Sequence, residues 1–315
     1  MERVQIGLSV GHGVSATAGA LGAPRARAER RWPRSSVLLA MPLGLVLVAF
    51  VVAPLAVVVA VSFFRYDNFA VIPAFTFENY QSVLGSWLTA SLYLTMIKLA
   101  VMTWAATLVI GFLVAYFLVF HVRNQLIAIG LFLVCTVPFW TSNIIRMISW
   151  LPLLGKQGAI NAALLDLGII HQPLQFLLYS DFAVVVSYVH LFTIFMIVPI
   201  FNAMSRIDPA LFEAAMDAGA SRWQTMRMVV FPLVRSGVVL GSVFVITLVM
   251  GDFYVVKIMS GGGAASVVSA MVDDISTLLF PHAAASAVIL LIVLGVLVAS
   301  IMRLVDIRRE LVGDR

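Results

Sequence analysis

The chain has 315 residues, of which 62% are hydrophobic and 11% are charged, and its formal net charge is +5. A soluble globular domain carries about 45–50% apolar and about 25% charged residues, so this chain cannot cover a water-facing surface and lipid must be its main solvent. The basic residues are scattered between apolar runs, which argues against a nucleic-acid-binding module. Cys135 is the only cysteine, so an intramolecular disulfide and a Cys-rich metal site are excluded.

Two tails flank the apolar part of the chain, and the first of them is basic. Residues 1–34 are rich in Gly, Ala and Arg without helical periodicity, and we expect a disordered cytoplasmic tail there. A second cytoplasmic tail is expected over residues 306–315. The apolar run after residue 34 is about twice as long as the ~7–15 residues of a cleavable signal peptide, which predicts a retained membrane anchor.

Six apolar runs predict an all-α polytopic membrane domain over residues 35–305, with six transmembrane helices. About 20 helical residues are needed to cross a hydrocarbon core about 30 Å thick. The runs are Ser35–Phe64, Leu99–Val122, Asn124–Ile145, Phe182–Ser205, Ser236–Gly251 and Ile275–Met302. The fifth run is the shortest, and it spans only if Asp252 or the Pro232 turn is partly immersed.

Lys and Arg are unevenly distributed over the segments outside these runs. If the six runs cross the membrane in turn, the segments on the side that carries both termini hold 15 Lys and Arg residues, and the segments on the other side hold 5. Because cytoplasmic loops carry the excess of Lys and Arg, both termini are expected in the cytoplasm.

The segment of about residues 207–232, between the fourth and fifth runs, predicts a helix–turn–helix against the inner face of the membrane. Asp208 and Pro209 are an N-cap and a first-turn proline. Good helix formers follow, and Gly219 is placed to end the helix in a left-handed conformation.

A second short helix is expected directly after Gly219. Ser221 and Gln224 have the spacing of a capping box, and Pro232 marks the entry to the next span.

Glu213 and Asp217 share one face of the first helix of this loop. Two like charges at this spacing cost an isolated helix a few tenths of a kcal/mol, and apolar side chains lie beside them in the sequence. One interpretation is that the acidic helix inserts into a cleft on another protein. The other is that Arg222 or Arg227 folds back to neutralise the pair, so that the loop only connects two spans.

The loop resembles the EAA loop of ABC importer permeases, whose pattern is E-A-A-x3-G-x9-I-x-L-P. The matching residues are Glu213, Ala214, Ala215, Gly219, Val229, Phe231 and Pro232, with Val for Ile and Phe for Leu. The resemblance extends over about residues 36–305 and is nearest to the spermidine/putrescine group of these permeases. Further matching segments are Phe77–Tyr80, Pro138–Ser142 with Arg146 and Trp150, and Leu151–Gly155 leading to Asn161.

This resemblance implies a type I ABC importer permease fold and a location in the bacterial inner membrane. It assigns docking on a cytoplasmic ATPase to Glu213, Ala214, Ala215, Asp217, Gly219 and Pro232 of the loop. The implied partners are cytoplasmic ATP-binding subunits, a second permease subunit of different sequence, an extracytoplasmic solute-binding protein and membrane lipid. The implied solute is a polyamine, and the alternatives are an amino acid derivative, a phosphonate or ferric ion.

Asp252, Trp140 and Arg146 are candidate residues of the translocation path. A charge at the bilayer centre costs on the order of 2.5–3.5 kcal/mol, so Asp252 is expected either to contact a cation in the path or to pair with Lys257 or Lys98. Lys98 is itself expected to snorkel at the outer end of the second span.

Gly237 and Gly241 are four residues apart in the fifth run. A stripe of small residues lets two membrane helices approach closely. We therefore expect the fifth span to pack tightly against a neighbour at these positions.

No enzymatic activity, catalytic residue, cofactor or metal site is expected in the chain itself. None of its three lysines is followed by the Ser or Thr of a P-loop, so energy must come from another subunit. An ion-driven secondary transporter is a rival interpretation, although it predicts several intramembrane carboxylates and pseudo-symmetric halves. A membrane-embedded enzyme is a second rival, but it needs acid, base or metal groups that converge at one depth.

Overall fold

The computed structural model describes residues 34–67, 70–262 and 265–303 of the chain. The two tails expected at residues 1–34 and 306–315 lie almost entirely outside this part. The chain divides into two units, residues 1–52 and residues 53–315. The first unit contains α1 (Arg34–Leu47) and the π-helix η1 (Val48–Val52).

The second unit begins with α2 and a short hairpin that leads into a long helix. These elements are α2 (Ala53–Ser62), β1 (Arg65–Asp67), β2 (Ala70–Ile72), α3 (Glu78–Gly85) and α4 (Trp87–Phe120). The strands are antiparallel, with Arg65 opposite Ile72. The Asn79 side chain donates to the carbonyl oxygens of Ser62 and Phe64, at 2.9 and 2.8 Å, and so satisfies backbone groups just after α2.

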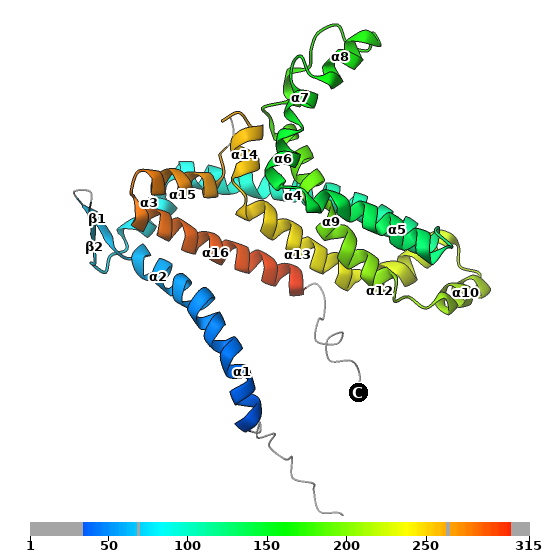
Figure 1. Cartoon of the computed structure of the whole chain (residues 1–315), viewed down its shortest axis with the longest axis horizontal. Coiled ribbons are helices and arrows are strands. Elements are labelled where there is room, and N and C mark those ends of the chain that lie inside the picture. Colours follow the sequence, from blue (N-terminus) through cyan, green and yellow to red (C-terminus); the bar gives the residue numbers. More distant parts are fainter. Residues whose placement is uncertain (1–33, 68–69, 263–264, 304–315) are drawn as a thin grey trace, which may run out of the picture. The chain divides into compact units, whose positions relative to one another are not determined.

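A sharp bend separates the next two helical segments. The elements are α5 (Gln125–Thr136), the 3-10 helix η2 (Val137–Trp140), α6 (Asn143–Ile148), α7 (Leu151–Leu154), α8 (Ala159–Asp166) and the 3-10 helix η3 (Gln175–Leu177). The chain bends by 93° between Trp140 and Asn143. Pro138 lies in η2, and a proline removes one backbone donor from a helix. The predicted third span therefore stops short of Ile145, and α7 and α8 extend away from the bundle (Figure 1).

The remainder of the chain contains three long helices joined by shorter ones. They are α9 (Asp181–Met204), α10 (Pro209–Asp217), α11 (Arg222–Thr225), the π-helix η4 (Met226–Val230), α12 (Phe231–Leu233), α13 (Arg235–Gly251), α14 (Tyr254–Met259), α15 (Val267–Ser276) and α16 (Phe280–Arg303). Figure 1 shows α10 and α12 at one end of the bundle, the loop end, and α3 and α15 at the opposite end, the far end. The last long helix begins at Phe280 and not at Ile275, because the chain turns through a left-handed Leu278 (φ 66°) after α15.

The core of the bundle lies where α9 packs between α4 and α13. Met196 of α9 is fully buried, and glycines contact it from both sides. A Cβ on Gly111 of α4 would lie 2.8 Å from Met196 Cγ, and one on Gly241 of α13 would lie 2.7 Å from its Sδ. At Gly237, a Cβ would lie 2.5 Å from the carbonyl oxygen of Pro199, so the predicted close approach of the fifth span is confirmed.

Four helices in the described part of the chain are long and apolar enough to cross a membrane, and there are up to six if each bent pair forms one span. The four are Met41–Ser62, Trp87–Phe120, Asp181–Met204 and Phe280–Arg303, and the pairs are Gln125–Trp140 with Asn143–Asp166 and Arg222–Leu233 with Arg235–Gly251. The predicted all-α membrane fold is confirmed. The second span begins twelve residues earlier than expected, at Trp87, because Lys98 does not interrupt the helix.

Candidate functional site

The loop of residues 207–232, named the coupling loop after the role that the EAA resemblance implies, begins with a capped helix. The Asp208 carboxylate accepts a hydrogen bond from the Ala210 backbone N–H at 2.9 Å, and Pro209 occupies the first helical position. Both features were predicted from the sequence, and together they satisfy or remove donors that a helix start leaves unpaired.

The end of α10 is a Schellman motif centred on Gly219. Gly219 has a φ of +77°; its N–H donates to the Met216 carbonyl at 2.9 Å, and the Ala220 N–H donates to the Ala215 carbonyl at 3.0 Å. This pattern of two reverse bonds requires a left-handed residue at the glycine position. The predicted role of Gly219 as a helix terminator is therefore confirmed.

The second helix of the coupling loop begins with the predicted capping box. Ser221 Oγ accepts from the Gln224 N–H at 3.3 Å, and Gln224 Oε1 accepts from the Ser221 N–H at 2.8 Å. The helical path continues from there through Pro232, which lies inside α12 rather than at a separate turn. The chain then bends by 62° into α13.

Two aromatic pairs attach the coupling loop to the end of α4. Phe212 of α10 packs edge-on against Phe120, with 5.0 Å between ring centroids. Phe231 of α12 stacks on Phe112, with centroids 4.9 Å apart and planes 15° apart. Both α10 and α12 are therefore in direct contact with α4. The sequence placed Phe212 and Phe231 in the loop, but it contained no signal for their partners.

The acidic face of α10 is exposed and forms no ion pair with any described residue of the chain. Glu213 and Asp217 are exposed, and no ion pair within the described residues involves either of them. The interpretation in which Arg222 or Arg227 folds back onto the pair is therefore wrong. Large apolar side chains are also exposed in the same loop. The exposed fractions of Met216, Trp223 and Met228 are 62%, 68% and 74%.

At the far end, Asp252 caps the junction between α13 and α14. Its Oδ1 accepts from the Tyr188 hydroxyl of α9 at 3.2 Å and from the Val255 N–H at 2.9 Å. No ion pair among the described residues joins Asp252 to Lys98 or Lys257, and Lys98 pairs instead with Asp181 at the start of α9. The expected Lys98 or Lys257 pairing of Asp252 is thus wrong.

The other two candidate path residues lie near the bend after α5. Trp140 is 85% exposed at the end of η2, whereas Arg146 of α6 is 6% exposed and donates to Asn143 Oδ1. Among the described residues, no hydrogen bond or ion pair joins Asp252, Trp140 and Arg146 to one another. Tyr188, which the sequence did not indicate, is the side chain that links Asp252 to the bundle.

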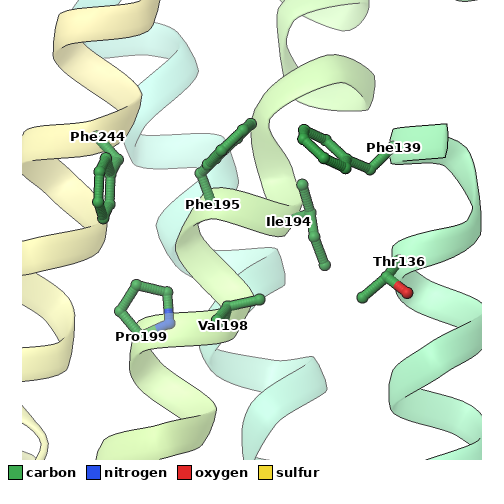
Figure 2. A pocket seen from close by; sticks show the side chains of 7 residues that line it. All are labelled: Thr136, Phe139, Ile194, Phe195, Val198, Pro199 and Phe244. Carbon is green, nitrogen blue, oxygen red and sulfur yellow. The ribbon is translucent and has the colours of Figure 1, made fainter. Parts of the chain in front are cut away.

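An apolar cavity of about 250 Å³ lies beside α9, toward α5, η2 and α13. Figure 2 shows Phe139, Phe195 and Phe244 around it, with Thr136 as the one hydroxyl-bearing residue in its lining. That hydroxyl donates to the Leu133 carbonyl at 2.7 Å. The cavity thus offers no free polar group that could recognise a solute.

Comparison with known proteins agrees with this arrangement. Residues 107–310 match the family described as binding-protein-dependent transport system inner membrane component. The chain is 34% identical over 217 residues to the spermidine/putrescine transport system permease protein PotB of Haemophilus influenzae, covering 68% of this chain and 74% of that protein. It is 33% identical to PotB of Escherichia coli, over 68% of this chain and 77% of that protein. It is 27% identical to the Escherichia coli inner membrane ABC transporter permease protein YdcU, over 64% of this chain and 67% of that protein.

A solved structure shows the same fold. The chain aligns with a bacterial ABC transporter involved in the import of the acidic polysaccharide alginate, with a TM-score of 0.65 and 15% identity, over 86% of this chain and 95% of that one. The resemblance deduced from the EAA loop is confirmed. The chain belongs to the family of binding-protein-dependent transport system inner membrane components and is an ABC importer permease.

Proposed function

We propose that this chain is one of two permease subunits in an importer that carries a polyamine, such as spermidine or putrescine, into a bacterium. The observation that supports the coupling role is the exposed acidic face of α10, a helix that is capped at both ends and whose carboxylates have no counter-charge in the described chain. The curated relatives of 33–34% identity support the choice of a polyamine.

In this proposal the coupling loop faces the cytoplasm and docks on an ATP-binding subunit. Glu213 and Asp217 supply charge, and Ala214 and Ala215 allow close approach to the ATPase surface. Closure of the ATPases would displace α10 and α12. The Phe212–Phe120 and Phe231–Phe112 contacts would pass that displacement to α4, which packs along α9.

The translocation path runs between the two permease subunits, and Asp252, Trp140 and Arg146 border it in this chain. Asp252 would contact the ammonium groups of the solute, and Trp140 would offer an aromatic face to them. An extracytoplasmic binding protein would deliver the solute at the far end.

Replacement of Glu213 by Lys tests the coupling role. We expect Glu213→Lys to insert at wild-type level but to lose uptake of labelled putrescine and copurification of the ATP-binding subunit. Asp166→Lys is the matched control, because Asp166 is also an exposed carboxylate but lies on α8, outside the coupling loop. Normal uptake and normal ATPase recovery with Glu213→Lys would remove the coupling role.

Competition between solutes tests the substrate class. Uptake of labelled putrescine should be reduced by unlabelled spermidine and unaffected by an equal concentration of a phosphonate or an amino acid derivative. The opposite pattern would assign the importer to another solute of the same family.

A further inference from the structure

Arg146 is a buried cation whose hydrogen-bonding groups are only partly satisfied. Its side chain is on α6, its residue is 6% exposed, and its Nη2 donates to Asn143 Oδ1. Its Nε is also buried and has no hydrogen-bond partner. None of the ion pairs in the described part of the chain includes Arg146.

The neighbouring histidine cannot balance this charge. His190 of α9 lies within electrostatic reach of the guanidinium. Its Nδ1 accepts a hydrogen bond from the Trp150 indole at 3.0 Å, and the two rings are in edge-to-face contact. An Nδ1 that accepts is unprotonated, so a neutral imidazole faces Arg146 and supplies no negative charge.

A buried guanidinium without a counter-charge is costly, because burial removes it from water and a single neutral acceptor, Asn143 Oδ1, offsets only part of the loss. Native proteins satisfy nearly all buried polar groups. Because no anion for Arg146 comes from the described chain, the missing acceptor is expected to come from another molecule.

The surface around Arg146 indicates that this other molecule is a protein. Ile144 and Ile145, which directly precede Arg146 on α6, are 45% and 67% exposed, so exposed apolar side chains lie next to the buried charge. The backbone between η2 and α6 is non-helical at Thr141 and Ser142, and both residues are exposed. Irregular backbone at membrane depth is tolerated only where protein covers it or where it lines a water-filled cavity, and a second polypeptide would provide such cover here.

We propose that Arg146 binds a carboxylate side chain of the second permease subunit, and that this ion pair helps to hold the two permeases together. This inference rests on the proposed function, in which two permease subunits enclose the path. The solute does not fit as the anion, because the polyamine proposed here is a cation. Ile144 and Ile145 would pack against the second subunit beside the pair.

Charge reversal in the intact importer tests the ion pair. All subunits are coexpressed, this chain is purified by an affinity tag in mild detergent, and the recovered second permease is quantified. Arg146→Glu should reduce that recovery by at least about tenfold, because breaking a buried pair leaves two unpaired charges. Arg146→Lys keeps the charge and should retain most of the recovery.

Lys156→Glu is the matched control, since it makes the same charge change at an exposed residue between α7 and α8. It should recover the second permease at wild-type level. Membrane insertion of every variant is measured separately with a fluorescent fusion, so that misfolding is recognised.

A rescue experiment identifies the partner residue. Each membrane-level Asp or Glu of the second permease is changed to Arg in turn, together with Arg146→Glu, and one such change should restore both recovery and uptake. Wild-type recovery with Arg146→Glu, or the failure of every reversal to restore it, would overturn the ion pair. Either result would leave the permease assignment standing, because that depends on the Glu213→Lys experiment.

Discussion

The hydroxyl of Tyr188 on α9 donates to the carboxylate of Asp252 at the end of α13, across 3.2 Å. Tyr188 is fully buried, so it holds Asp252 from the interior of the bundle, whereas Asp252 itself is only partly buried. The two residues are 64 positions apart, and their contact holds the α13–α14 junction against α9.

If Asp252 contacts a cationic solute, Asp252→Asn should weaken uptake more than Tyr188→Phe does. The first change removes the charge, whereas the second keeps the charge and the bond from the Val255 N–H. We expect Asp252→Asn to raise the apparent KM for putrescine about tenfold, and Tyr188→Phe to raise it less than about threefold. Uptake kinetics at matched expression measure both. Equal effects of the two variants would show that Asp252 acts only through its structural contact.

Gly237→Ala should destabilise the packing of α13 on α9. The added Cβ would lie 2.5 Å from the Pro199 carbonyl oxygen and 2.8 Å from Ala203 Cβ, so the two backbones must separate. Overpacking of this kind costs about 1–3 kcal/mol, and it should lower the Tm of the detergent-solubilised protein. The control is Gly295→Ala on α16, where a Cβ meets nothing within 4 Å. A Tm for Gly237→Ala that matches the control would contradict the close approach.

Gly219 should tolerate Asn better than Val. The left-handed φ of +77° is open to Gly and accessible to Asn, but it is strained for a β-branched side chain. Gly219→Val should therefore distort the end of α10 and reduce ATPase copurification, while Gly219→Asn should retain most of it. Pull-down of the ATP-binding subunit from coexpressing cells measures the difference. Similar recovery with Val and Asn would show that docking does not depend on this helix end.

The coupling loop should react with thiol reagents only from the cytoplasmic side. Ala215→Cys and Lys156→Cys are made separately in a Cys135→Ala background, since Cys135 is the only native cysteine. A membrane-impermeant maleimide should label Lys156→Cys in intact cells. It should label Ala215→Cys only after the membrane is permeabilised. Labelling of Ala215→Cys in intact cells would place the loop outside and end the coupling proposal.

The local features of this chain could be read from its sequence. Long apolar runs predict helices in lipid because no other backbone arrangement satisfies its own hydrogen bonds there, apart from a closed barrel. The caps of the coupling loop were equally readable, because Asp208, Ser221 and Gly219 act on backbone groups only a few residues away. The EAA pattern was sufficient to indicate the family for the same reason, since its residues form one continuous loop.

Contacts between distant residues were decided by the tertiary structure alone. Lys98 was expected to snorkel and Asp252 to find a lysine, yet Lys98 pairs with Asp181 and Asp252 bonds with Tyr188. Charge type limits the partners that a residue can take, but the packing of α4, α9 and α13 determines which of them lies within reach. The sequence by itself thus determined the membrane-spanning fold class and the capped loop, because these depend on neighbours along the chain, whereas the ends and bends of the helices were set by the structure. The side chains that meet between helices were set by the close packing of the bundle, which no local pattern encodes.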